Sequence, residues 1–197
     1  MIELPDWAVP NSASPTYVDF GGLLTPGLGG RVQRIDRMGN RFRVSVGFPP
    51  MVSKDRGRIL VSRLLRAKSE GLRLEFPLLG FKPGSPGAPK VNGAGQSGRT
   101  LIADGFTPNY IIREGQWFSL EEDGQHYLHN VDAEVVANAS GQATLTISPM
   151  LRVEPSDNAV LHFSKPMLEG YVRGEEWQWQ MSLSHHLTLE AEIEERA

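Results

Sequence analysis

The chain has 197 residues, of which 40% are hydrophobic, so it can bury a sizeable core as one large domain or two small ones. Its formal net charge of -3 arises from mixed acidic and basic residues, which gives no support to a dominant role on nucleic acids or anionic membranes. The absence of cysteine excludes disulfides, thiol nucleophiles and thiolate metal ligands. With no signal-peptide pattern and no run of about 18 apolar residues, we expect a soluble protein without a membrane anchor.

The first thirty residues are rich in Pro, Ser and Gly and follow neither a helical nor a strand period. We interpret residues 1–30 as an extended N-terminal arm. Either this segment packs on its own domain or it docks on a neighbouring subunit. Its apolar side chains, including Trp7 and Phe20, favour contact with protein over a solvated tail.

A hairpin and a helix are predicted next. Residues 31–37 and the alternating run 42–48 flank Gly39-Asn40, a pair typical of tight hairpin turns. The arginines in this region are expected on a solvated strand face. Ser53 is a candidate N-cap for an amphipathic helix over about 53–70.

Composition changes sharply after residue 79. Residues 80–98 are dominated by Pro and Gly, so we expect a long surface loop without a packed element. Short runs separated by Asp-Gly, Glu-Gly and Ser-Gly turns then predict a small antiparallel barrel or sandwich. The expected strands are 100–102, 110–112, 117–120, 126–131, 134–138, 143–147 and 160–163.

An alternation of apolar and polar residues runs from Trp177 to Ile193, which indicates a β-strand. At about 3.3 Å per residue it would span roughly 55 Å, so it either bends between two sheets or extends toward a partner. The apolar parity predicts a buried face, and the glutamates are expected to form an acidic outer face that discourages edge pairing. The predicted outer glutamates are Glu190, Glu192, Glu194 and Glu195.

Motifs for catalysis are missing from the sequence: there is no nucleophile elbow, zinc-binding His-Glu-x-x-His, dinucleotide fingerprint or P-loop. His126 and His129 are three apart on a predicted strand and point to opposite faces, and the neighbours His185 and His186 do the same. We therefore predict no catalytic residues, no metal site and no cofactor, and we expect the protein not to be an enzyme.

Two interpretations of the large apolar side chains remain open. The first assigns a set of them to the core or to a subunit interface. That set is Trp7, Phe20, Trp177, Trp179, Met181, Leu183 and Leu187. The second is a carbohydrate-binding module, in which sugars stack on Trp117, Trp177 or Trp179.

Several stretches resemble the tail-tip structural proteins of long-tailed bacteriophages, especially distal tail proteins and baseplate ring components. The suggestive stretches are Phe20-Gly21-Gly22 with Gly29-Gly30, then residues 112–120, 127–129 and 140–152. The last two contain a tyrosine strand and Gly-Gln-Ala-Thr-Leu-Thr-Ile-Ser-Pro, which is similar to small β-barrels of phage tail and baseplate proteins. These stretches cover roughly half of the chain.

The resemblance implies a mainly β fold: a split antiparallel β-sandwich or barrel with one amphipathic helix and an inserted small β-barrel. Residues 31–79 and 171–197 would form the ring-forming domain, and residues 80–170 the inserted barrel, in agreement with the composition breaks. The implied function is a hexameric virion ring that assembles in the host cytoplasm and joins the tail tube to the hub. Its implied partners are further copies of itself, the tail tube, the hub or baseplate and the tape-measure protein, with DNA only passing through the lumen.

Overall fold

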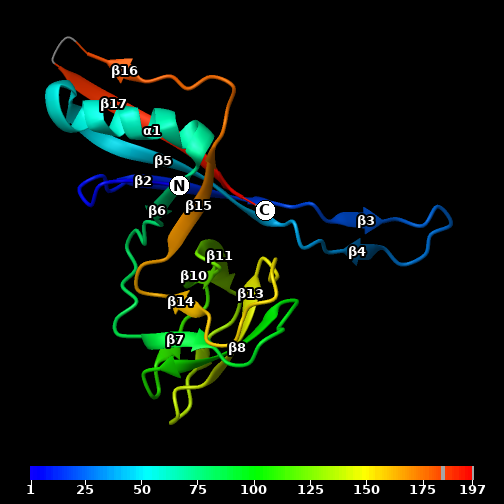
Figure 1. Cartoon of the computed structure of the whole chain (residues 1–197). Coiled ribbons are helices and arrows are strands. Elements are labelled where there is room, and N and C mark those ends of the chain that lie inside the picture. Colours follow the sequence, from blue (N-terminus) through cyan, green and yellow to red (C-terminus); the bar gives the residue numbers. More distant parts are fainter. Residues whose placement is uncertain (183–184, 197) are drawn as a thin grey trace.

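The computed structural model describes residues 1–182 and 185–196. The chain is mainly β, as predicted, and combines an open sheet with a closed barrel (Figure 1). The described residues contain one α-helix, α1 (Arg58–Glu70), which follows a π-helical turn, η1 (Ser53–Gly57). None of the described helical segments has the length and apolar character needed to cross a membrane.

The open sheet is built from both ends of the chain. Among the described residues its path runs β1, β6, β15, β17, β5, β2, with β16 added beside β17. The pairing is antiparallel except between β1 and β6. The strands are β1 (Ile2–Glu3), β2 (Ser12–Val18), β5 (Arg41–Val52), β6 (Leu72–Glu75), β15 (Met167–Val172), β16 (Gln180–Met181) and β17 (His186–Glu195).

Strands β5 and β17 form the centre of the sheet. Their buried residues face each other in register, with Ile193 opposite Val44, Ala191 opposite Val46 and Leu189 opposite Phe48. Helix α1 covers this face with Leu60 and Leu64 (Figure 1). The helix begins without the predicted cap, because no side chain caps either helical start and the Ser53 amide donates to the carbonyl of His185.

The predicted hairpin around Gly39-Asn40 is wrong. Strand β2 pairs with β5, and the same two chain segments continue as β3 (Gly22–Leu24) paired with β4 (Gln33–Ile35), so the chain reverses near residues 26–29. Asn40 is buried at the break between the two pairings. Its side chain accepts from the Phe20 amide at 2.7 Å and donates to the Tyr17 hydroxyl at 3.0 Å. Asn40 therefore joins two strands instead of forming a turn.

The first thirty residues form strands of the sheet as well as a projection. Strands β1 and β2 pair with the sheet, whereas β3 and β4 extend away from it as a two-stranded ribbon (Figure 1). We call residues 20–38 the ribbon tip. The segment expected as an extended arm is thus partly an edge of the sheet and partly one side of this ribbon.

The long alternation from Trp177 to Ile193 is two strands. The chain reverses between β16 and β17, and His185 adopts a positive φ of 61° in the reversal. The single bent or overlong strand predicted from the pattern is therefore wrong, because period-2 patterning does not reveal where a chain turns. Residues 183 and 184, including the predicted core residue Leu183, lie outside the described part of the chain.

The closed barrel follows the order β10, β11, β13, β8, β7, β14 within the described residues. Its strands all lie between β6 and β15 in the chain, so the chain leaves the sheet, builds the barrel and returns. The barrel strands are β7 (Gly87–Val91), β8 (Thr100–Phe106), β10 (Trp117–Glu122), β11 (Gln125–Val131), β13 (Ala143–Ser148) and β14 (Val160–His162). A small ribbon of β9 (Ile111–Ile112) and β12 (Val135–Val136) accompanies them.

One barrel strand was not expected. Residues 80–98 were predicted to lack any packed element, yet β7 pairs with both β8 and β14. Val91 is fully buried, and Pro89 lies where the register of β7 and β8 shifts, a position that tolerates its missing amide hydrogen. A proline-rich composition therefore concealed a strand that the barrel needs for closure.

Candidate functional site

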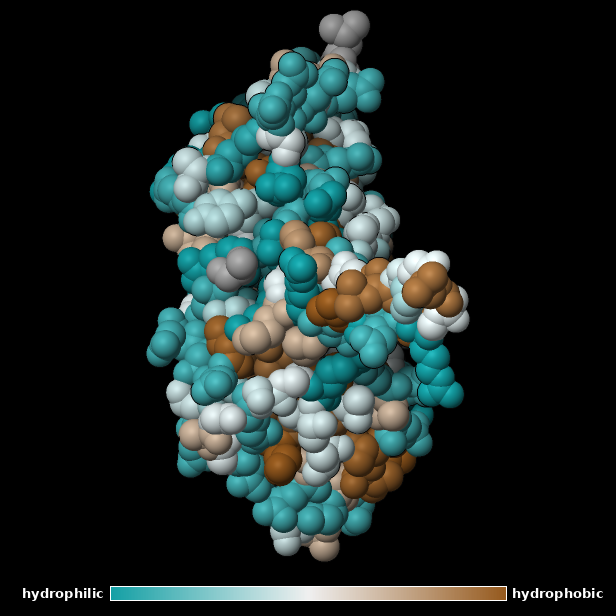
Figure 2. Space-filling view, turned by 90° about the vertical axis from the view of Figure 1, so that its right-hand side faces the viewer, coloured by the Kyte–Doolittle hydropathy of each residue, from teal (hydrophilic) through white to brown (hydrophobic). Residues whose placement is uncertain are grey.

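The ribbon tip exposes apolar side chains on a part of the molecule that has no core. Every residue from 22 to 38 is exposed. Figure 2 shows the molecule from the side toward which β3 and β4 extend in Figure 1. Hydrophobic side chains gather there on a protruding part of the surface. The exposed large apolar residues of the ribbon tip are Phe20, Leu23, Leu24, Leu28, Val32, Ile35 and Met38.

Few contacts hold the ribbon tip in shape. Arg34 bonds to Asp19 at 2.8 Å and to Asp36 at 2.7 Å, and the guanidinium of Arg41 lies 4.8 Å from the centre of the Phe20 ring. These ion pairs are solvated, and such pairs contribute little to stability. A two-stranded hairpin is at best marginally stable on its own, so this surface is suited to being covered by another protein.

A buried ionic clamp fastens the sheet to the barrel. Glu195, at the end of β17, accepts hydrogen bonds from the Phe42 amide at 2.7 Å, the Leu128 amide at 2.8 Å and Arg152 Nη2 at 2.6 Å. Phe42 belongs to the sheet and Leu128 to the barrel, so one carboxylate spans both bodies. Glu195 and the Arg152 side chain are almost completely buried.

Two further buried glutamates form ion pairs near this clamp. Glu194 contacts Arg41 at 2.6 Å, Arg43 at 2.8 Å and Arg173 at 3.1 Å. Burial raises the pKa of Glu194, but the hydrogen bonds from Arg41 and Arg43 outweigh it and the net direction is downward. Glu169, also buried, bonds to Arg73 and Arg196, each at 2.8 Å.

The junction corrects two predictions about the charged residues. Glu194 and Glu195 were expected on an acidic outer face, but both are buried. Glu194 lies against arginines of the sheet, and Glu195 lies against Leu128 and Arg152. Arg41 and Arg43 are likewise drawn into the ionic contacts, although they were expected on a solvated strand face. Such paired buried charges hold elements in register, and the arrangement indicates a structural role.

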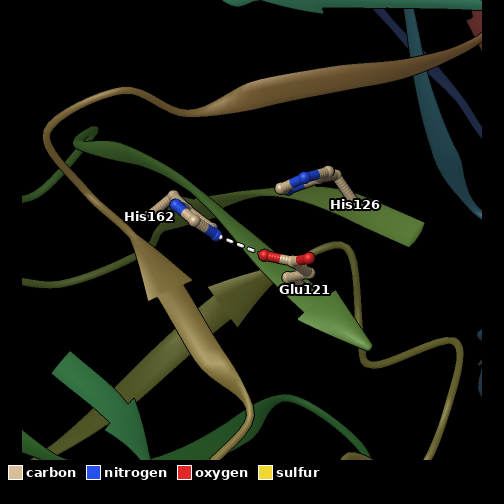
Figure 3. Close-up of side chains that lie close together, drawn as sticks. All are labelled: Glu121, His126 and His162. Carbon is tan, nitrogen blue, oxygen red and sulfur yellow. Dashed lines mark hydrogen bonds and ion pairs between the residues drawn. The ribbon is translucent and has the colours of Figure 1, made fainter. Parts of the chain in front are cut away.

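A histidine–carboxylate cluster lies on the barrel surface near this junction. One ligand-type atom each of Glu121, His126 and His162 lies within 4.8 Å of the other two (Figure 3). His162 Nε2 donates to Glu121 Oε2 at 2.8 Å, and the rings of the two histidines are 5.0 Å apart. The residues come from β10, β11 and β14, three neighbouring strands of the barrel.

The local environment favours one protonation state for two members of the cluster. Burial lowers the pKa of His126, and the nearby His162 lowers it further, so the neutral imidazole is favoured. The hydrogen bond from His162 lowers the pKa of Glu121, so the carboxylate is favoured. This is the donor set of a metal site, two imidazole nitrogens and a carboxylate oxygen.

Sequence reasoning missed this cluster because it compared histidines only along one strand. The two-residue turn at Asp123-Gly124 joins β10 to β11 and places Glu121 directly opposite His126. That register could have been read from the turn length. The position of His162 beside them could not, because it depends on how β14 closes the barrel onto β10.

The residues predicted for a core or interface are distributed over the sheet and the ribbon. Leu187 is buried in the core, as the parity predicts, and Phe20 is exposed on the ribbon tip. Trp7 is partly buried beneath the guanidinium of Arg56, 5.4 Å from the ring centre. Met181 is 70% exposed, so its predicted place on a buried face is wrong, because β16 lies outside the region that α1 covers.

The tryptophans predicted as a sugar platform do not share one surface. Trp177 and Trp179 lie beside each other with ring centres 5.0 Å apart, and both are partly buried against the sheet core. Trp117 lies between Phe42 and Phe76, with ring centres at 4.8 and 4.7 Å. Trp177 lines a groove of about 450 Å³, and Trp117 lines a separate, smaller one of about 240 Å³.

No protein-family model matches the chain, and no curated protein shows significant similarity to it. Function must therefore be argued from the ribbon tip, the junction and the histidine–carboxylate cluster.

Proposed function

We propose that the protein is a non-enzymatic structural component of a virion, which forms a ring at the distal end of a phage tail. In this proposal the ring joins the tail tube to the hub or baseplate and surrounds the channel for the tape measure and DNA. The protein would assemble in the host cytoplasm and reside at the tail tip. The sequence resemblance supplies the class of assembly, and the ribbon tip supplies the physical argument.

The observation that carries the proposal is the exposure of every residue from 22 to 38 together with seven large apolar side chains on the ribbon tip. Burial of apolar area stabilises a contact by about 25 cal/mol per Å², so a neighbour that covers these side chains gains substantial free energy. A second copy of the chain is the occupant we favour. Repeated head-to-tail docking of one ribbon on the next copy closes a ring when the rotation between copies permits it.

The edge of the sheet next to the ribbon disfavours assembly by strand addition, which is the main alternative to docking through the ribbon tip. Strand β2 is an outer strand, paired only with β5 among the described strands. It carries Pro15, which cannot donate to a further ladder, so open-ended strand addition at β2 is disfavoured. Contact through the ribbon tip then remains the more specific route to assembly.

The test uses a double variant of the ribbon tip, Leu24→Asp with Leu28→Asp. Both side chains are exposed, so the isolated chain should fold normally. We expect the wild type to be incorporated into tails and the double variant to be lost from them, as measured by mass spectrometry of purified particles and by sedimentation velocity. Val136→Asp is the control, because Val136 is as exposed as Leu24 but lies in β12, far along the chain from the ribbon tip.

Two outcomes would contradict the proposal. One is a wild-type chain that is monomeric in solution and absent from particles. The other is a double variant that enters particles as well as the wild type and the Val136→Asp control. A monomer in solution that still enters particles supports the proposal, because the tail tube can serve as the template for assembly.

Carbohydrate binding is the second candidate function, and the groove beside Trp177 is the observation in its favour. Ser14, Arg173 and Glu190 line this groove together with the tryptophan, a combination of an aromatic face and polar groups that suits sugars. The Trp177 indole N–H already donates to the Glu190 carbonyl at 2.7 Å. Glycan-array binding that disappears in Trp177→Ala with folding retained would favour this function over a purely structural one.

A further inference from the structure

We propose that Glu121, His126 and His162 form a binding site for a divalent transition-metal ion, and that Zn²⁺ is the ion the site fits. The inference does not depend on the ring proposed above. It rests on the geometry of the histidine–carboxylate cluster, on the burial of His126 and on the polar groups that surround it.

The geometry requires only a small contraction around an ion. In a tetrahedral zinc site with bonds of about 2.0–2.1 Å, ligand atoms lie about 3.3 Å apart. The three ligand atoms here are no more than 4.8 Å apart, and Glu121 and His162 are already in contact at 2.8 Å. The side chains of Glu121 and His162 are about one third exposed, so they have room to rotate toward His126.

His126 provides the fixed member of the site. It is only 5% exposed, and its Nδ1 lies 3.4 Å from Ser119 Oγ, which also accepts the Met167 amide at 2.9 Å. A His126 tautomer with hydrogen on Nδ1 donates to Ser119 and leaves the Nε2 lone pair for an ion. Such a second contact, which orients the ring, is typical of histidines that bind metals.

The surrounding charges are compatible with a bound cation. Outside the cluster, the positive charge of Arg73 contributes to the lowered pKa of His126, and Arg73 already pairs with Glu169 at 2.8 Å and with Glu3 at 3.4 Å. Glu169 Oε2 in turn accepts from the His126 amide at 3.4 Å. The positive charge of Arg73 is therefore largely compensated before an ion arrives.

Binding would link three strands at one edge of the barrel. Glu121, His126 and His162 belong to β10, β11 and β14, and β14 is followed by the segment that returns the chain to β15. Three protein ligands leave a fourth position for water or for a side chain of another protein. We therefore expect the ion to stabilise the barrel next to its attachment to the sheet.

The test measures Zn²⁺ binding to the full chain by equilibrium dialysis and isothermal titration calorimetry with zinc chloride. We expect one ion per chain for the wild type and an affinity loss of at least about tenfold for both Glu121→Gln and His162→Gln. Thermal denaturation without metal checks that these partly exposed substitutions leave the fold intact. Zn²⁺ should raise the melting temperature of the wild type and not that of the two variants.

The adjacent pair His185 and His186 supplies the matched control. Replacing both by Gln removes two histidines outside the cluster, and we expect this variant to bind Zn²⁺ as the wild type does. Co²⁺ should also give the intense visible absorption of a four-coordinate site in the wild type and in this control. The proposal is overturned by a wild type that retains no Zn²⁺, by equal binding in the cluster variants, or by loss of binding only in the control.

Discussion

Glu195 allows the sharpest test of how the sheet and the barrel are held together. In Glu195→Ala, Arg152 loses its ion pair while only 4% of its side chain is exposed, and the amides of Phe42 and Leu128 lose their acceptor. Removing one partner of a buried ion pair typically costs about 3–5 kcal/mol. Each buried amide left without an acceptor adds about 1–3 kcal/mol, although such terms do not add fully.

We therefore expect Glu195→Ala to lower the free energy of unfolding by at least about 3 kcal/mol. For a chain of this length that corresponds to a fall of at least about 6 °C in melting temperature. Differential scanning calorimetry and urea denaturation measure both quantities. Glu192→Ala is the control, because Glu192 lies on the same strand but its 3.3 Å contact with Arg43 is solvated, where a pair contributes at most about 1 kcal/mol. If the two variants differed by less than about 1 kcal/mol, the clamp would not have the role assigned to it.

Two further outcomes follow from burial in the sheet and the barrel. Leu187→Asp places a charge in the core beneath α1 and should unfold the sheet or block its assembly, whereas Glu192→Gln should be mild; circular dichroism of the two proteins checks this, and equal tolerance would refute the parity of β17. Burial lowers the pKa of His129 from 6.5 to about 3, so the folded state holds a neutral ring where the unfolded state is protonated. Its contribution to stability is full above pH 6.5 and is lost as the pH falls toward 3, with a slope of up to about 1.4 kcal/mol per pH unit. Urea denaturation of the wild type and His129→Gln between these pH values should show a shallower dependence in the variant, and identical slopes would contradict the assignment.

Local patterns predicted the barrel strands other than β7, because each of those strands is bounded by turn residues. The runs expected at 117–120, 126–131 and 143–147 agree closely with β10, β11 and β13. Alternation and Gly-containing turns are signals within a few residues, and they need no knowledge of distant partners. The mainly β fold with one helix was predictable for the same reason.

Pairing between distant segments was not predictable in the same way. Gly39-Asn40 has the composition of a hairpin turn, but the Asn40 side chain instead forms hydrogen bonds with the Phe20 amide and the Tyr17 hydroxyl. Glu194 continues the polar parity of β17, yet it is buried against Arg41 and Arg43. Glu195 falls on the apolar parity and is buried in contact with the barrel. A periodic pattern records which residues alternate, but the burial of each face depends on what the rest of the chain brings against it.

The candidate sites also combine features that local sequence determines with features that depend on pairing between distant segments. The Glu121–His126 pair is fixed by a local turn, whereas His162 joins it only through closure of the barrel. The apolar residues of the ribbon tip are visible in the sequence, but only the structure shows that the core does not include them and that they are exposed. Sites assembled across strands therefore require the register of the fold, and neither motif searches nor spacing along one strand can identify them.

The buried glutamates connect the barrel to the part of the sheet from which the ribbon extends. Strand β5 carries Phe42, whose amide bonds to Glu195, and the segment that precedes β5 in the chain forms β4, one side of the ribbon. Glu195 also bonds to Leu128 of the barrel, and Glu169 connects the barrel strand β11 to Arg73 of β6. Because charged hydrogen bonds of this kind fix geometry more strictly than apolar contact does, the orientation of the barrel is tied to the strand that bears the ribbon. Docking of the ribbon on a neighbouring copy would thus also set where each barrel points, which a ring that presents its barrels in a regular array requires.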